Sequence, residues 1–237
     1  ENEIATALIP HLETNVLDAV YFYGAGCVPD KVPMMHNALS THLNTKNGIE
    51  VNTDMLAVAR GLCGHKPGIA CIMGTGSNSC FYDGEKIASN VSPLGFILGD
   101  EGSGAVLGKL LVGDMLKNQM TPELKEKFLN KTGLTPPEII DRVYRQPFPN
   151  RFLASLSPFL AENIQEPSVH ALVLGSFKAF FQRNVMQYDY KNHPVHFIGS
   201  VAYHYQDILH EAARELEIQI TTIVKSPMQG LMTFHQS

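Results

Sequence analysis

The chain has 237 residues, 44% of them hydrophobic, and its 18 basic and 23 acidic residues give a formal net charge of −5. This composition is typical of a globular protein with a buried core, and the evenly spread charges argue against a nucleic-acid-binding surface. No apolar run approaches the roughly 20 residues that cross a bilayer, and the four cysteines show no CxxC spacing, so we expect a cytoplasmic protein with reduced thiols and no membrane partner.

The first quarter of the chain predicts alternating helices and strands. Apolar spacing predicts a helix over 1–12, a strand over 18–23 and a helix over 33–43, followed by a strand over 49–53 and a helix over 54–62. Asp54 is expected at the N-cap of that last helix, at the carboxyl end of the preceding strand. Open α/β sheets bind ligands at this end of their strands, so Asp54 is a candidate general base, although N-capping alone also explains an aspartate there.

The remainder predicts a second domain beginning near residue 67. Three strands, over 68–73, 78–82 and 86–89, form a meander linked by GTGS and by the Asp83-Gly84 turn. Helical spacing starts at Ser103 and continues in four further segments: 122–129, 137–144, 151–164 and 168–188. A strand over 195–198, a helix over 201–216, a strand over 218–224 and a helix over 227–235 complete an α/β fold with a mixed sheet.

The turn Gly74-Thr75-Gly76-Ser77 could bind an anion. Its glycines permit close backbone approach, so that the four amides and two hydroxyls can line a concavity suited to a nucleotide phosphate. A plain hairpin turn is an equally good interpretation of the motif alone. The chain has no GxxxxGK[ST] phosphate loop.

Adjacent acids occur in GDEGSG, where Gly99 and Gly102 flank Asp100 and Glu101. Helix capping explains one acid well and two less well, because both would have to complement the same helix N-terminus. Paired carboxylate acceptors suit neighbouring sugar hydroxyls, which is the interpretation we favour.

Gly199 and Ser200 connect a predicted strand to a predicted helix, where the ribose or base of a nucleotide could lie against the backbone. A tight strand-to-helix turn explains them at least as well. The ten histidines form no HExxH motif, and no protein-bound metal site is predicted.

Three segments together resemble a known family: NTD at 52–54, GTGSNS at 74–79 and GFILGDEGSGAVLGK at 95–109. They are similar to the BadF/BadG/BcrA/BcrD ATPases and the related N-acetylglucosamine kinases, and FIGSVAYHY and KSPMQGL follow in the expected order. The resemblance covers nearly the whole chain. It implies the actin-like ATPase superfamily, in which two ribonuclease-H-like lobes close on ATP and Mg²⁺.

The resemblance also implies roles for particular residues. Asp54 is similar to the base that deprotonates the acceptor hydroxyl of an amino sugar such as N-acetylglucosamine. The second phosphate loop corresponds to Gly74, Thr75, Gly76 and Ser77, the sugar contacts to Asn78 and Asp100 with Glu101 beside them, and the adenosine site to Gly199 and Ser200. The remainder of the first lobe is expected over 1–66, and the second lobe with a helical insertion over 67–237, with its final helix, 227–237, as a candidate to pack back on the first lobe.

One departure from the family pattern concerns the first phosphate loop. The family opens with a strand and hairpin bearing DGGGT or a close variant, and no DxGxT occurs before Asp18. Because the chain also starts with Glu1, we expect it to be a fragment whose first lobe lacks its opening strands. As given, it is not expected to be a competent kinase, in contrast to the intact gene product.

Two other functions compete with a sugar kinase. The first is an ATPase that drives a partner enzyme through an iron–sulfur cluster held by cysteines, although Cys71 and Cys80 lie at apolar strand positions typical of a core. The second is a non-catalytic sensor that binds a sugar or a nucleotide. The apolar helices after Ser103 also offer enough surface for a homodimer.

Overall fold

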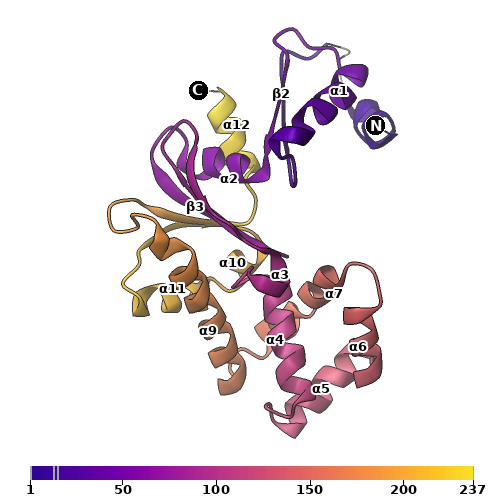
Figure 1. Ribbon diagram of the computed structural model, residues 1–237, viewed down its shortest axis with the longest axis vertical. Coiled ribbons are helices and arrows are strands. Elements are labelled where there is room, and N and C mark those ends of the chain that lie inside the picture. The colour runs from indigo at the N-terminus through magenta and orange to yellow at the C-terminus, as the bar shows by residue number, and fades with distance from the viewer. Residues whose placement is uncertain (1, 13, 15, 237) are drawn as a thin grey trace. The chain divides into compact units, whose positions relative to one another are not determined.

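A computed structural model describes residues 2–12, 14 and 16–236 (Figure 1). The chain divides into two compact units, Glu1–Val58 and Ala59–Ser237. The division falls inside helix α2 (Asp54–Cys63). The lobe boundary expected near residue 67 stays a prediction.

The first unit contains a parallel pair of strands, β1 (Val20–Gly24) and β2 (Ile49–Thr53), joined through the turn η3 (Pro29–Lys31) and helix α1 (Val32–His42). Parallel strands need a long crossover, which the helix supplies. Cys27, Leu39, Leu43 and Val51 form the small core of this unit.

The predicted helix over 1–12 is confirmed as a helical segment over residues 2–11, although it is not a regular α-helix. Residue 1 lies outside the described residues. After helical residues 2 and 3 the chain forms a π-helical turn η1 (Ile4–Leu8), followed by a 3₁₀ turn η2 (Ile9–His11). Pro10 lacks an amide N–H and clashes with the preceding turn, which explains why a regular helix is not maintained here.

The second unit is built on a five-stranded sheet in the order β5-β4-β3-β6-β7. The predicted meander is confirmed, because β3 (Gly68–Met73), β4 (Ser77–Tyr82) and β5 (Ile87–Val91) pair antiparallel in sequence. Strands β6 (Val195–Ile198) and β7 (Ile220–Val224) run parallel to β3. The carboxyl ends of β3 and β6 therefore meet at the same edge of the sheet.

Helices follow the meander, and several start at predictable caps. The Ser103 hydroxyl caps α4 by accepting the Val106 amide, and the Thr121 hydroxyl caps α5 by accepting the Leu124 amide. The helices up to residue 183 are α3 (Gly95–Leu98), α4 (Gly104–Leu116), α5 (Pro122–Thr132), α6 (Pro136–Tyr144), α7 (Pro149–Ser155), α8 (Ser157–Glu162) and α9 (Pro167–Arg183). The sequence interpretation missed the short helix α3, and a 3₁₀ turn η4 (Val185–Gln187) follows α9.

Two predicted helices are each divided in the structure. The segment 151–164 breaks at Leu156 because Pro158 has no amide to offer the Ala154 carbonyl, which instead accepts the Ser157 hydroxyl at 2.9 Å. The segment 201–216 divides at Tyr205 into α10 (Ser200–His204) and α11 (Gln206–Glu215). The last helix, α12 (Met228–Gln236), packs on α2 so closely that a Cβ on Gly230 would lie 1.9 Å from the Gly61 carbonyl oxygen.

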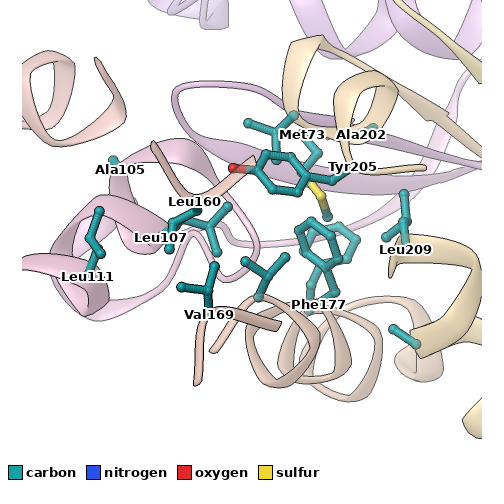
Figure 2. Close-up of a cluster of buried hydrophobic side chains, with 14 of the residues drawn as sticks. Met73, Ala105, Leu107, Leu111, Leu160, Val169, Phe177, Ala202, Tyr205 and Leu209 are labelled. Carbon is teal, nitrogen blue, oxygen red and sulfur yellow. The ribbon is translucent and has the colours of Figure 1, made fainter. Parts of the chain in front are cut away.

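The main core lies between one face of the sheet and helices α4, α9 and α11 (Figure 2). Met73 from β3, Phe177 from α9 and Tyr205 between α10 and α11 meet there, and Tyr205 donates its hydroxyl to the Ser157 carbonyl at 2.5 Å. Each such buried side chain contributes about 1.5–3 kcal/mol through removal from water. The end of β3 is thus held rigidly at the point where the GTGS turn begins.

His196, on the central strand β6, is buried and pairs in register with Ala70 of β3. Its Nδ1 atom has no hydrogen-bond partner among the residues that the structure describes, and burial lowers the pKa of the imidazole below its ordinary value of 6.5. At pH values between the folded and the unfolded pKa of His196, the unfolded chain binds more protons than the folded chain. The contribution of neutral His196 to the unfolding free energy is therefore fully present above pH 6.5 and is lost as the pH falls through the folded pKa.

We therefore expect the unfolding free energy from urea titrations to decline between pH 8 and pH 5 more steeply in the wild type than in His196→Gln. The matched control is His210→Gln, at an exposed histidine of α11. Equal pH slopes in all three proteins would contradict the assignment of this dependence to His196.

No helix in the described ranges is long and apolar enough to cross a membrane.

Candidate functional site

The Gly74-Thr75-Gly76 turn between β3 and β4 is anchored by its carbonyl groups. The first two amides of α4 donate to it, from Gly104 to the Gly74 oxygen at 2.8 Å and from Ala105 to the Thr75 oxygen at 3.1 Å. The Gly74 amide donates to the Gly76 oxygen at 2.9 Å and closes the turn. The N-terminus of α4 is therefore used to orient the turn rather than to bind a ligand directly.

This anchoring leaves two amides free. A trans peptide directs its C=O and N–H to opposite sides, so the Thr75 and Gly76 amides both point away from α4. Neither amide donates to an acceptor in the part of the chain that the structure describes. A Cβ on Gly74 would meet nothing within 4 Å, so the space beside the turn is open. Two adjacent free amides facing open space form an anion-binding concavity.

Asp100 lies directly against this turn. Its carboxylate accepts the Ser77 amide, and a Cβ on Gly76 would lie 3.0 Å from its Oδ2 atom. The Ser77 hydroxyl donates to the Glu101 carbonyl at 2.8 Å and ties the two motifs together a second time. Thus the structure brings the predicted phosphate turn and the predicted sugar carboxylate into contact.

The Asp100 carboxyl group is half-buried. Burial raises its pKa, and the neighbouring Glu101 carboxylate raises it further, while the Ser77 amide and the Lys109 ammonium group lower it. Lys109 is held nearby by donating to the Phe96 carbonyl at 2.6 Å. A partly desolvated carboxylate with one amide donor has acceptor capacity left for a ligand hydroxyl.

Gly199 reaches the same turn from β6. Its backbone has a φ of +118°, and a Cβ there would lie 2.4 Å from the Met73 carbonyl oxygen and 3.3 Å from the Gly74 amide nitrogen. Its own amide donates to the Val224 oxygen at 3.1 Å, and exposed Ser200 begins α10. The predicted adenosine residues are thus adjacent to the predicted phosphate turn.

Asn78 is placed differently from the other predicted sugar contacts. Side chains alternate along a strand, so Asn78 faces the side of the sheet opposite to Ser77 and Ser79. Its Oδ1 atom accepts the Ser79 amide at 2.9 Å and the Asn90 side chain at 3.0 Å. Among the described interactions none joins Asn78 to Asp100, and a role in sugar binding stays a prediction.

Asp54 lies in the first unit, at the carboxyl end of β2 and next in sequence to Thr53, which pairs with Gly24 of β1. The expectation that Asp54 is the N-cap of α2 is wrong. The Thr53 hydroxyl accepts the Leu56 amide at 3.2 Å, as an N-cap does, and Asp54 is the first helical residue. Its Oδ1 atom accepts the Met55 amide at 2.9 Å, and the side chain is half-buried.

Three residues near the site were not predicted from the sequence. On α9, Ser176 accepts the Gly102 amide at 3.1 Å, and the Arg183 Nε atom lies 3.0 Å from the Glu101 Oε1 atom. The third is Lys109. For Ser176 the sequence does contain a signal: it is a polar residue at helical spacing within an otherwise apolar face formed by Val169, Val173 and Phe180.

Within the described residues, no group of three or more histidine, cysteine, aspartate or glutamate side chains could hold a metal ion. His193 and His196 do have a three-residue spacing that the sequence interpretation did not recognise. However, the His193 ring packs on Phe81, and the His196 side chain is buried without a partner for Nδ1.

Solved structures of low sequence identity share the fold of this chain. A candidate N-acetylglucosamine kinase from Chromobacterium violaceum matches 91% of the chain and 75% of its own length, with 20% identity and a TM-score of 0.71. A ROK hexokinase from Thermus thermophilus matches 92% of the chain and 78% of its own length, with 12% identity and a TM-score of 0.51. The fold is the mixed α/β fold of actin-like ATPases and sugar kinases.

A closer match identifies the family. The structure of a candidate N-acetylglucosamine kinase from Porphyromonas gingivalis shares 54% identity and a TM-score of 0.90, covering 92% of the chain and 77% of that protein. The chain therefore belongs to the N-acetylglucosamine kinase-like ATPase family, which confirms the resemblance seen in its motifs. No family model and no curated protein gives a further match.

Proposed function

We propose that this protein is an ATP-dependent kinase that phosphorylates an amino sugar, N-acetylglucosamine or a related hexosamine. The observation that carries the proposal is the pair of free amides, at Thr75 and Gly76, beside the half-buried Asp100 carboxylate. A phosphate-binding turn and a hydroxyl-binding carboxylate in contact suit transfer of a phosphoryl group to a sugar. The name of the Porphyromonas gingivalis relative supports the same activity.

The nucleotide would be held by two adjacent segments. Gly74 to Ser77 would bind phosphate oxygens through the free amides and the Thr75 hydroxyl, and Gly199 with Ser200 would lie along the adenosine. ATP would supply the γ-phosphoryl group, and Mg²⁺ would neutralise the charge that develops during transfer. The backbone amides contribute fixed dipoles that need no reorganisation during transfer.

The acceptor sugar would be bound and activated by carboxylates. Asp100, with Glu101 and Asn78, would accept hydrogen bonds from sugar hydroxyls, and Asp54 would remove the proton from the acceptor hydroxyl as general base. Because a base must touch the hydroxyl that it deprotonates, closure of the protein around the sugar is part of this proposal.

The same proposal assigns two ribonuclease-H-like lobes. Support for the second lobe comes from its sheet, in which three sequential antiparallel strands are extended by β6 and β7 in parallel. The helices between α4 and α9 would form its insertion. The first unit, with its parallel β1 and β2, would contribute to the first lobe.

The test is ATP turnover by the full-length gene product with Mg²⁺ and a panel of N-acetylglucosamine, N-acetylmannosamine, glucosamine and glucose. We expect turnover to depend on an amino sugar, with the phosphorylated sugar detected by mass spectrometry. Turnover that ignores every sugar would indicate a partner-driven ATPase, and binding without turnover would indicate a sensor.

The cysteines do not favour the partner-driven ATPase. Cys71 and Cys80 are buried, and burial raises both thiol pKa values, that of Cys80 to about 12. An iron–sulfur cluster shared with a partner needs thiolates at the surface, whereas these groups are neutral thiols inside the protein.

A further inference from the structure

The turn formed by Asp100 to Ser103 has a strained backbone. Asp100 has a φ of +53°, in the left-handed region that non-glycine residues rarely adopt, and Gly102 has a φ of +74°. Such strain persists only where surrounding groups over-determine the conformation. The groups that hold this turn therefore decide where the Asp100 carboxylate lies.

The inner side of this turn is fixed by packing. A Cβ on Gly102 would lie 2.8 Å from Met73 Cε and 3.3 Å from the Phe177 ring, so there is no space for movement inward. The Asp100 amide donates to the Pro93 carbonyl at 2.9 Å, and the buried Ser176 hydroxyl accepts the Gly102 amide.

The outer side is hollow. Glu101 and Arg183 both line a cavity of about 600 Å³ between α4 and α9 and a second cavity of about 220 Å³ beside η4. Few side chains therefore pack around the Glu101 carboxylate. On this side its Oε1 atom lies 3.0 Å from the Arg183 Nε atom, which provides its polar contact. The Glu101 side chain is 14% exposed, while that of Arg183 is 62% exposed.

We propose that Arg183 is a positioning residue, which acts through Glu101 to set the place and charge of Asp100 against the phosphate-binding turn. The inference rests on the proposed function, in which Asp100 binds the acceptor sugar. An ion pair with one exposed partner adds little to global stability, so its effect is local. The guanidinium group of Arg183 balances the charge of the Glu101 carboxylate, which lies next in sequence to Asp100, and holds it toward α9.

The test is a double-mutant cycle with Arg183→Gln and Glu101→Gln in the full-length protein. Arg183→Gln should raise the sugar KM about tenfold, the size of one charge-assisted contact, with a smaller change in kcat. Arg183→Lys should restore most of the loss. In the Glu101→Gln background the same arginine change should alter KM less than about twofold, because the group through which it acts is absent.

A second readout does not require catalysis. Titration of the Asp100 carboxyl group by ¹³C NMR should move to higher pH in Arg183→Gln, since the Glu101 charge is no longer compensated, and should return toward the wild type in Arg183→Lys. The matched control is Lys178→Gln. Lys178 lies on α9, as Arg183 does, and the change breaks its 2.5 Å contact with Glu215 of α11, away from the turn. It should change neither KM nor the titration.

The outcomes separate this inference from the proposed function. If the wild type phosphorylates no sugar, the proposed function fails, and the NMR titrations still decide the role of Arg183. If the Asp100 titration in Arg183→Gln equals that of the wild type, or if the arginine change has the same effect with and without the Glu101 carboxylate, the positioning role is overturned.

Discussion

Asp54→Asn is expected to lower sugar-dependent ATP turnover by about 10²- to 10⁴-fold, the usual contribution of a positioned general base. The side-chain amide retains the shape of the carboxylate and can still accept the Met55 amide through its oxygen, so the fold should be kept. It cannot remove a proton from the acceptor hydroxyl. The measurement is steady-state kcat for the preferred sugar, with KM for ATP determined in parallel.

The control for this change is Asp30→Asn, at an exposed aspartate of the first unit in turn η3. It removes the same charge from the same unit without touching the carboxyl end of β2. A kcat in Asp54→Asn within threefold of the control would reject Asp54 as the base, and the proton would then need another acceptor.

Much of the fold was predictable because it rests on local signals. The strands over 68–73 and 195–198 appear at those positions, and Ser103 caps α4 where the apolar helical spacing starts. The GTGS motif was ambiguous alone, since a plain hairpin turn explained it equally well, and in GDEGSG helix capping explained one of the two acids. The structure shows that the two motifs are in contact, through the Ser77 amide and hydroxyl. This contact depends on the tertiary fold, so no local pattern predicts it, and it does not identify the ligand.

Other features depend on contacts that no local pattern reveals. Arg183 follows Glu101 by more than 80 residues, and nothing near either residue indicates the partner. The helix divisions have different origins: the break at Leu156 follows from Pro158 and was predictable, whereas the break at Tyr205 accompanies a buried hydroxyl bonded to Ser157. Asn78 was grouped with Asp100 on the family resemblance alone, although strand alternation places its side chain on the face of the sheet opposite to Ser77 and Ser79.

Gly199→Ala is expected to destabilise the protein by roughly 2–5 kcal/mol, because two separate costs fall on one methyl group. The first is the φ of +118°, which side-chain-bearing residues rarely adopt. The second is the 2.4 Å approach to the Met73 oxygen, which is backbone and cannot rotate away. Relief requires the carboxyl ends of β3 and β6 to separate, which would also displace Gly74 and weaken ATP binding.

Gly74→Ala provides the matched control, one residue beyond the carbonyl that Gly199 would strike. Its Cβ would enter open space, and its φ lies outside the left-handed region, so the unfolding free energy should stay within about 1 kcal/mol of the wild type. Thermal unfolding measures both variants, at about 2–4 °C per kcal/mol for a chain of this size. A wild-type Tm for Gly199→Ala would mean that the two strand ends are not packed this closely. A low Tm for Gly199→Ala beside an unchanged Tm for Gly74→Ala would establish that the carboxyl ends of β3 and β6 need glycine at residue 199 for a steric reason.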